Sequence, residues 1–176
     1  MTNIQKILED SIKAERAEEM KTSDQLTVGE LILKLEAVDG GLPIYFDDKK
    51  YRPSGIESWR GSYCELALTY EGGGSINSEK VIEVVEVCGQ GYKVYERIDT
   101  TLPSNPKVKD LLEMLRDSIG KTMEGYKGGN FLIGKTTPVW VANYGDSGGY
   151  IGDDQAVVGV RAVGSKAILQ TRQIDY

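Results

Sequence analysis

The sequence predicts an α+β domain in which helices flank a mainly antiparallel sheet. Two segments, around Leu31 and around Leu111, carry apolar residues at helical spacing. Several short strand-like runs are separated by glycine-containing turns, as in hairpins. Helices do not alternate with every strand, which disfavours a parallel, doubly wound sheet.

The start of the chain predicts an amphipathic helix over residues 3–20. One apolar stripe runs along this otherwise charged segment, formed by Ile4, Ile7, Leu8 and Ile12. Residues 21–25 then resemble a linker. We therefore expect an N-terminal helix within residues 1–22, followed by a single ligand-binding domain over residues 23–176.

A second helix is predicted to begin after Thr27. Thr27 has the spacing of a capping box with Glu30, and apolar residues at helical spacing continue to about Ala37. Gly40-Gly41 is expected to stop the helix. A strand led by proline follows at residues 43–46.

The same order of elements returns later in the chain. Apolar residues from Val108 to Ile119 predict a helix that ends at Gly120, and a strand led by proline follows at residues 138–142. The segments LTVGELILKLEAV…LPIYF and PKVKDLLEMLRDSI…TPVWVA therefore suggest one helix-and-strand unit used twice.

The remaining strands are predicted from apolar, β-branched and aromatic runs. Residues 63–70 form one such run. Two hairpins are expected, the first around the turn Gly89-Gln90-Gly91 and the second around Gly164-Ser165. The hairpin strands cover residues 81–87, 92–98, 156–163 and 166–174.

Composition limits the classes of function. The chain has 176 residues, a formal net charge of −6 and a pI near 4.8, which argues against a general binder of nucleic acid or anionic membranes. It contains no histidine, so the commonest general base and zinc ligand are missing. There is no long apolar run, and the start is too charged for a signal peptide, so we expect a cytosolic protein. The two cysteines, Cys64 and Cys88, are interpreted as ordinary strand residues.

The stretch GNFLIGKT, residues 129–136, formally satisfies the phosphate-loop pattern of nucleotide triphosphatases. A true phosphate loop joins a strand to a helix, whose N-terminus faces the phosphates. Here Thr137-Pro138 and a strand-like run follow instead. We therefore interpret the match as a coincidence.

Three segments are candidates for ligand contact, because they combine aromatic rings, cations or amides with small residues. Rings stack on bases, and the arginine fork suits phosphate oxygens. The segments are Ser58–Tyr63 (SWRGSY), Glu124–Gly129 (EGYKGG) and Trp140–Gly145 (WVANYG). The alternative is that Trp59 and Tyr63 pack in the core while Arg60 pairs with Glu57 or Glu65.

An acidic loop follows the third segment. Asp146, Asp153 and Asp154 lack the spacing of a calcium-binding loop, so a solvated loop is expected rather than a metal site. Asn143 and Ser147 either read the edges of a base or stabilise a turn.

Taken together, the segments resemble a family of small phage-encoded proteins. Its members share S-[WY]-R-G-x-Y-x-x-L-A-L, then E-G-Y-K-G-G and P-x-W-V-A-N-Y-G, which appear here as SWRGSYCELAL, EGYKGG and PVWVANYG. The resemblance covers roughly residues 26–160. The N-terminal helix and the hairpin near residues 81–98 fall outside it.

The resemblance implies a viral sponge, similar to anti-CBASS and anti-Thoeris factors, that sequesters a cyclic nucleotide immune signal without cleaving it. It implies a homo-oligomer, a dimer or tetramer, in the cytoplasm of an infected bacterium, with a cyclic dinucleotide such as 3′3′-cGAMP as ligand and no cofactor or metal. The candidate ligand-binding residues are Trp59, Arg60, Gly61, Tyr63, Tyr126, Lys127, Gly128, Trp140, Asn143 and Tyr144.

Two other classes of function stay open. A metal-dependent enzyme that degrades a nucleotide signal would use the acidic loop, although a non-enzymatic binder fits the lack of histidine better. An inhibitor that binds a host protein would use the N-terminal amphipathic helix as its docking element.

Overall fold

A computed structural model describes residue 4 and residues 24–47, 51–57, 66–70, 80–87, 90–96, 101–124, 130–141 and 155–173. Of the predicted N-terminal helix, only Ile4, which is helical, belongs to these residues. The elements are α2 (Val28–Glu36), β1 (Ile44–Phe46), β2 (Pro53–Glu57), β3 (Leu66–Tyr70), β4 (Lys80–Val87), β5 (Gln90–Glu96), α3 (Val108–Ser118), β6 (Thr122–Glu124), β7 (Asn130–Leu132), β8 (Val139–Val141), β9 (Gln155–Val163) and β10 (Lys166–Gln173).

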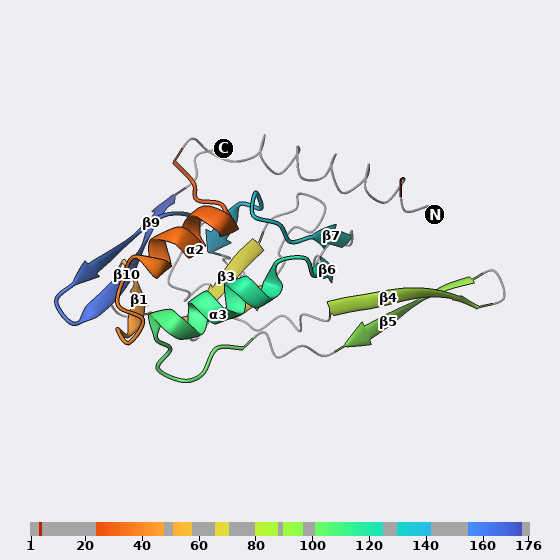
Figure 1. Cartoon of the computed structure of the whole chain (residues 1–176), viewed down its shortest axis with the longest axis horizontal. Helices are drawn as coiled ribbons and strands as arrows, with labels where there is room; N and C mark the ends of the chain where they lie inside the picture. Colours follow the sequence, from red (N-terminus) through yellow and green to blue (C-terminus); the bar gives the residue numbers. More distant parts are fainter. Residues whose placement is uncertain are drawn as a thin grey trace.

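The predicted α+β class is confirmed. A six-stranded sheet has the order β1-β10-β9-β8-β3-β2, and α2 and α3 lie side by side across one of its faces (Figure 1). The sheet is mixed, because β1 pairs with β10 and β3 pairs with β8 in parallel, whereas its other pairs are antiparallel. The Phe46 N–H donates to the Tyr51 carbonyl, which precedes β2, so the two edges of the sheet approach each other.

Both predicted hairpins form, although Gln90 and Gly91, predicted as part of the first turn, belong to β5. β4 pairs with β5, and this two-stranded ribbon extends away from the main sheet (Figure 1). β9 pairs with β10 across a turn in which Gly164 has φ +60, a conformation that glycine adopts without steric cost. A further short antiparallel pair, β6 with β7, follows α3 and precedes β8 along the chain. This pair was not predicted.

The helix boundaries follow their local signals. Thr27 is the N-cap of α2 and accepts a hydrogen bond from the Glu30 N–H at 3.2 Å. At the start of α3 the Asp110 carboxylate accepts the Lys107 N–H at 2.8 Å. Helix α3 ends before Gly120, whose φ of +81 is typical of a residue that terminates a helix.

Hydrogen bonds link the two suggested units in the same way. The first unit is α2-β1-β2-β3 and the second is α3-β8-β9-β10. At the start of α2, Val28 N–H donates to the Thr137 carbonyl at 2.8 Å. At the start of α3, Val108 N–H donates to the Leu42 carbonyl at 3.0 Å. Each helix therefore begins on the segment that leads into the first strand of the other unit.

The exchange between units extends to the sheet. The first strand of each unit pairs in parallel with the third strand of the other, β1 with β10 and β8 with β3. Within each unit the second and third strands form an antiparallel pair. The isolated bridges follow the same exchange, because each joins the residue before one unit's helix to the proline before the other unit's first strand. These bridges are Thr27↔Pro138 and Pro43↔Lys107. By this equivalence, Tyr45 in β1 occupies the position that Trp140 occupies in β8.

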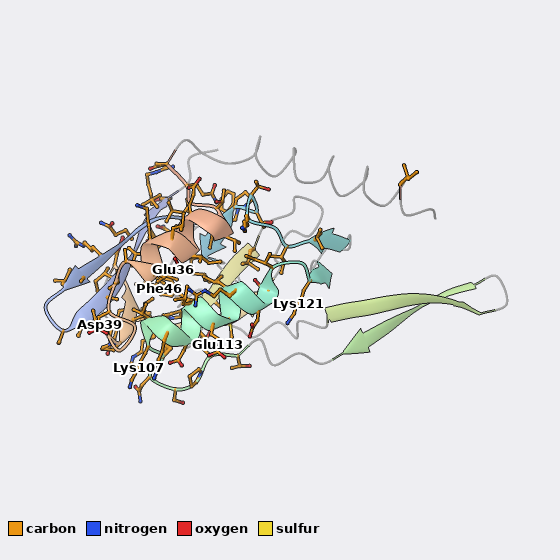
Figure 2. All side chains as sticks on the ribbon, in the orientation of Figure 1. Glu36, Asp39, Phe46, Lys107, Glu113 and Lys121 are labelled. Atoms are coloured by element: carbon orange, nitrogen blue, oxygen red, sulfur yellow. The ribbon has the colours of Figure 1, made fainter. Side chains whose placement is uncertain are left out.

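The main core lies between the helices and the sheet. Figure 2 labels Phe46 between the two helices in this view, and its side chain is fully buried. On the far side of the helices, Arg116 of α3 pairs with Glu36 of α2 at 2.7 Å. The buried residues of this core are Leu26, Val28, Leu31, Ile32, Leu35, Ile44, Phe46, Ile56, Leu66, Leu68, Leu102, Val108, Leu111, Leu115, Ile133, Val139, Val141, Val157, Ala167 and Leu169.

Within the part of the chain that the structure describes, no helix has the length and apolar character needed to cross a membrane.

Replacing Thr27 with alanine is expected to lower the free energy of unfolding by about 1 kcal/mol. The hydroxyl that accepts the Glu30 N–H would be lost, and this donor is partly buried. Urea denaturation measures the effect. Thr136→Ala is the matched control, because Thr136 is exposed and its replacement should change stability by less than about 0.5 kcal/mol. Equal effects of the two variants would contradict the capping role.

Candidate functional site

Of the ten candidate ligand-binding residues, the described residues include only Trp140. The other nine predictions lie outside the described residues. They are Trp59, Arg60, Gly61, Tyr63, Tyr126, Lys127, Gly128, Asn143 and Tyr144.

Trp140 lies at the centre of β8, on the sheet face that points away from the main core. Its neighbours in sequence, Val139 and Val141, belong to the main core on the other face. The register places Trp140 between Ala67 of β3 and Ala156 of β9. A large ring therefore stands between two small residues, which leaves room for it to lie close to the sheet.

The start of β8 is fixed by the segment before α2. The Val139 N–H donates to the Leu26 carbonyl at 3.0 Å, and the Gln25 side chain donates to the Val139 carbonyl at 3.1 Å. Gln25 is completely buried, so its amide is held in place by its surroundings. These contacts set the position from which Trp140 projects.

The indole N–H of Trp140 is the unusual feature of this position. The residue is only 5% exposed, and Nε1 is buried with no hydrogen-bond partner among the described residues. A buried donor without a partner costs about 1–3 kcal/mol. Buried indole groups normally find an acceptor. Among the described residues, the indole N–H therefore has an unused capacity to donate one hydrogen bond.

At a second aromatic position, two cationic side chains lie over the ring of Tyr45. The Arg52 guanidinium lies 5.0 Å and the Lys166 ammonium 4.6 Å from the centre of the Tyr45 ring. Arg52 also donates to the Asn105 side-chain oxygen, and Asn105 has a φ of +56, which asparagine tolerates better than most residues. Sequence reasoning missed this group. The available signal was the similarity of PIYF to PVWV, which aligns Tyr45 with Trp140.

The phosphate-loop-like segment is followed by a strand and not by a helix, which confirms the prediction. Its described part, residues 130–136, consists of β7 and a turn that leads into β8. Lys135 is exposed, and its carbonyl accepts the Gly29 N–H of α2 at 2.9 Å. The N-terminal donors of α2 are thus used by the chain itself rather than being directed at a ligand.

The described residues contain no group of three or more histidine, cysteine, aspartate or glutamate side chains suited to a metal ion. The acidic loop with Asp146, Asp153 and Asp154 lies outside them.

Comparison with known proteins found no family model, no curated protein and no solved structure that matches this chain.

Proposed function

We propose that the protein binds and sequesters a cyclic nucleotide signal, a cyclic dinucleotide such as 3′3′-cGAMP, without cleaving it, and so inhibits CBASS-type anti-phage defence. The observation that carries the proposal is the buried indole N–H of Trp140, which has no hydrogen-bond partner among the described residues. Trp140 opens the segment W-V-A-N-Y-G, in which Asn143 and Tyr144 are further candidates for ligand contact. Cyclic dinucleotides supply the acceptors that an isolated donor requires, in their phosphates and base edges.

The affinity that a sponge requires favours an oligomer. Nanomolar binding corresponds to about 12 kcal/mol. One stacked ring supplies about 1–3 kcal/mol and one charge-assisted hydrogen bond about 1.5–3 kcal/mol. A single set of contacts falls short of this total. In a homodimer or tetramer, a ligand with its own near-twofold symmetry takes the same contacts from two subunits across an isologous interface.

Sequestration is tested by recovering the ligand. The full chain is mixed with a panel of cyclic di- and trinucleotides and cyclic ADP-ribose isomers, removed by filtration, and then heat-denatured. A cyclic dinucleotide that leaves the filtrate and returns intact supports the proposal. Recovery of a cleaved product would instead identify an enzyme. If all ligands stay in the filtrate, the proposal fails, and capture of a host protein becomes the competing function to examine.

Trp140→Phe tests the indole N–H itself, because phenylalanine keeps an aromatic ring and removes the donor. We expect the dissociation constant of the captured ligand to rise about tenfold or more. Tyr51→Phe serves as a control that also removes one polar group from an aromatic ring, since Tyr51 packs against the main core. Isothermal titration calorimetry measures both, and circular dichroism verifies the fold. Unchanged affinity in Trp140→Phe would remove Trp140 from the site.

A further inference from the structure

A group of cationic residues surrounds Tyr45 on the outer face of the sheet, which we call the Tyr45 cluster. It consists of Tyr45, Arg52, Arg161 and Lys166. The register shows that the residues share one face, because Tyr45 pairs with Ile168 and Ile168 pairs with Arg161. Lys166 lies two residues before Ile168 on β10 and therefore projects to the same side.

The cations of the Tyr45 cluster are close together. Arg52 and Lys166 both lie within 5.0 Å of the same ring centre. Arg161 stands two strands away from Tyr45, which corresponds to about 10 Å at the usual strand spacing. Three positive charges therefore gather on one face of a chain whose net charge is −6.

The described carboxylates do not neutralise Lys166 or Arg161. Neither residue forms an ion pair with another described residue, whereas Arg172, further along β10, is held by Asp24 with Nε and Oδ2 2.8 Å apart. The carboxylate of Asp47, just after β1, accepts the Thr171 N–H at 2.8 Å. The repulsion between Lys166 and Arg161 is thus left for another anion to offset.

A purely structural role explains only part of the cluster. A cation over a tyrosine ring contributes about 0.5–1 kcal/mol at an exposed site, which accounts for Arg52 and Lys166. Arg161 is exposed and has no ring contact among the described residues. Its placement in the same row adds a charge that the packing of Tyr45 does not need.

We propose that the Tyr45 cluster is a binding site for a small phosphate-bearing anion, separate from Trp140. Arginine presents a planar fork that matches phosphate oxygens, and lysine adds a compact charge. The Tyr45 ring holds Arg52 and Lys166 in position, and the Asn105 side chain orients Arg52 further. A long nucleic acid is disfavoured because the acidic chain would repel its remaining phosphates. The site therefore suits a ligand with a few charges, such as a diphosphate group.

The test uses pyrophosphate as the probe and the full-length chain. Isothermal titration calorimetry at physiological ionic strength is expected to show saturable binding. Lys166→Gln and Arg161→Gln should each weaken the binding about tenfold, as expected for the loss of one charge-assisted contact. Lys34→Gln is the matched control, because Lys34 is exposed on α2 and its replacement removes the same charge. The affinity of this variant should stay within about twofold of the parent, because α2 covers the opposite face of the sheet and interactions between separated exposed charges are largely screened.

The outcomes separate this site from the cyclic nucleotide site. Absence of saturable pyrophosphate binding would overturn the inference, and so would an equal loss in Lys34→Gln, which would indicate a general effect of net charge. Trp140→Phe should leave pyrophosphate affinity unchanged if the two sites are independent, and a parallel loss would contradict the separate site. The filtration assay for cyclic dinucleotides and the pyrophosphate titration are separate measurements. The proposed sponge function and the proposed anion site are therefore able to fail independently.

Discussion

Replacing Leu31 with alanine is expected to lower the free energy of unfolding by about 2–5 kcal/mol. Leu31 projects from α2 into the main core and is fully buried. Truncation removes apolar contacts and leaves a cavity between α2 and the sheet, which the surrounding residues only partly fill. Because a domain is stable by only about 5–15 kcal/mol, a loss at the upper end would leave the variant marginally folded at 25 °C. Urea denaturation followed by circular dichroism measures the change.

Leu33→Ala is the matched control, since it is the same substitution on the same helix. Leu33 is 66% exposed, and its replacement should change stability by less than about 0.5 kcal/mol. Comparable losses in both variants would mean that the face of α2 assigned to the core is wrong. If Leu31→Ala lowers the free energy of unfolding by clearly less than about 2 kcal/mol, the core has closed around the truncated side chain and the expected cavity is absent.

Replacing Gly29 with valine is expected to destabilise the protein by about 1–3 kcal/mol through overpacking. A Cβ at Gly29 would stand 3.1 Å from the Lys135 Cβ and 3.1 Å from its carbonyl oxygen. The same backbone contact carries the Gly29 N–H bond to Lys135, so the helix is not able to move away without lengthening that bond. Thermal and urea unfolding measure the loss.

The second unit supplies a rescue for this variant. There the backbone N–H of Lys109 in α3 donates to the Gly40 carbonyl at 3.0 Å. The lysine is therefore on the helix and the glycine on the facing segment, the reverse of Gly29 and Lys135. A Cβ at Gly40 would meet the Lys109 Cβ at 3.5 Å, an ordinary contact distance. Lys135→Gly should therefore restore part of the stability lost in Gly29→Val. A double-mutant cycle tests this. Strictly additive effects would show that the Gly29–Lys135 contact and the Lys109–Gly40 contact are not equivalent.

The local elements could be predicted because their signals lie within a few residues. Thr27 and Glu30 mark the start of α2, and the cap is formed between them. Gly164 marks the turn of the β9–β10 hairpin. The two parallel pairs could not be predicted in this way, because they join strands from different units, as with Ile44 and Ala167. Nothing in the residues between such partners specifies which distant strand will be the neighbour.

The surroundings of Trp140 and the Tyr45 cluster could not be predicted for the same reason. The motif around Trp140 is continuous in sequence, and its aromatic residue could be selected without a structure. The burial of its indole N–H depends on the arrangement of the sheet, where Ala67 and Ala156 flank it. The Tyr45 cluster draws Arg52 and Lys166 from separate parts of the chain. Only folding brings these cations to one ring.

The sequence by itself determined α2, α3 and the two hairpins, because period, caps and turns are local properties of the chain. It also suggested the repeat of a helix followed by a proline-led strand. The tertiary structure decided how the two units combine. Each helix begins on the other unit's segment, through bonds such as Val28 to Thr137 and Val108 to Leu42. Pairing of this kind depends on which buried backbone groups are able to satisfy one another once the core has formed. That choice is a property of the folded chain as a whole.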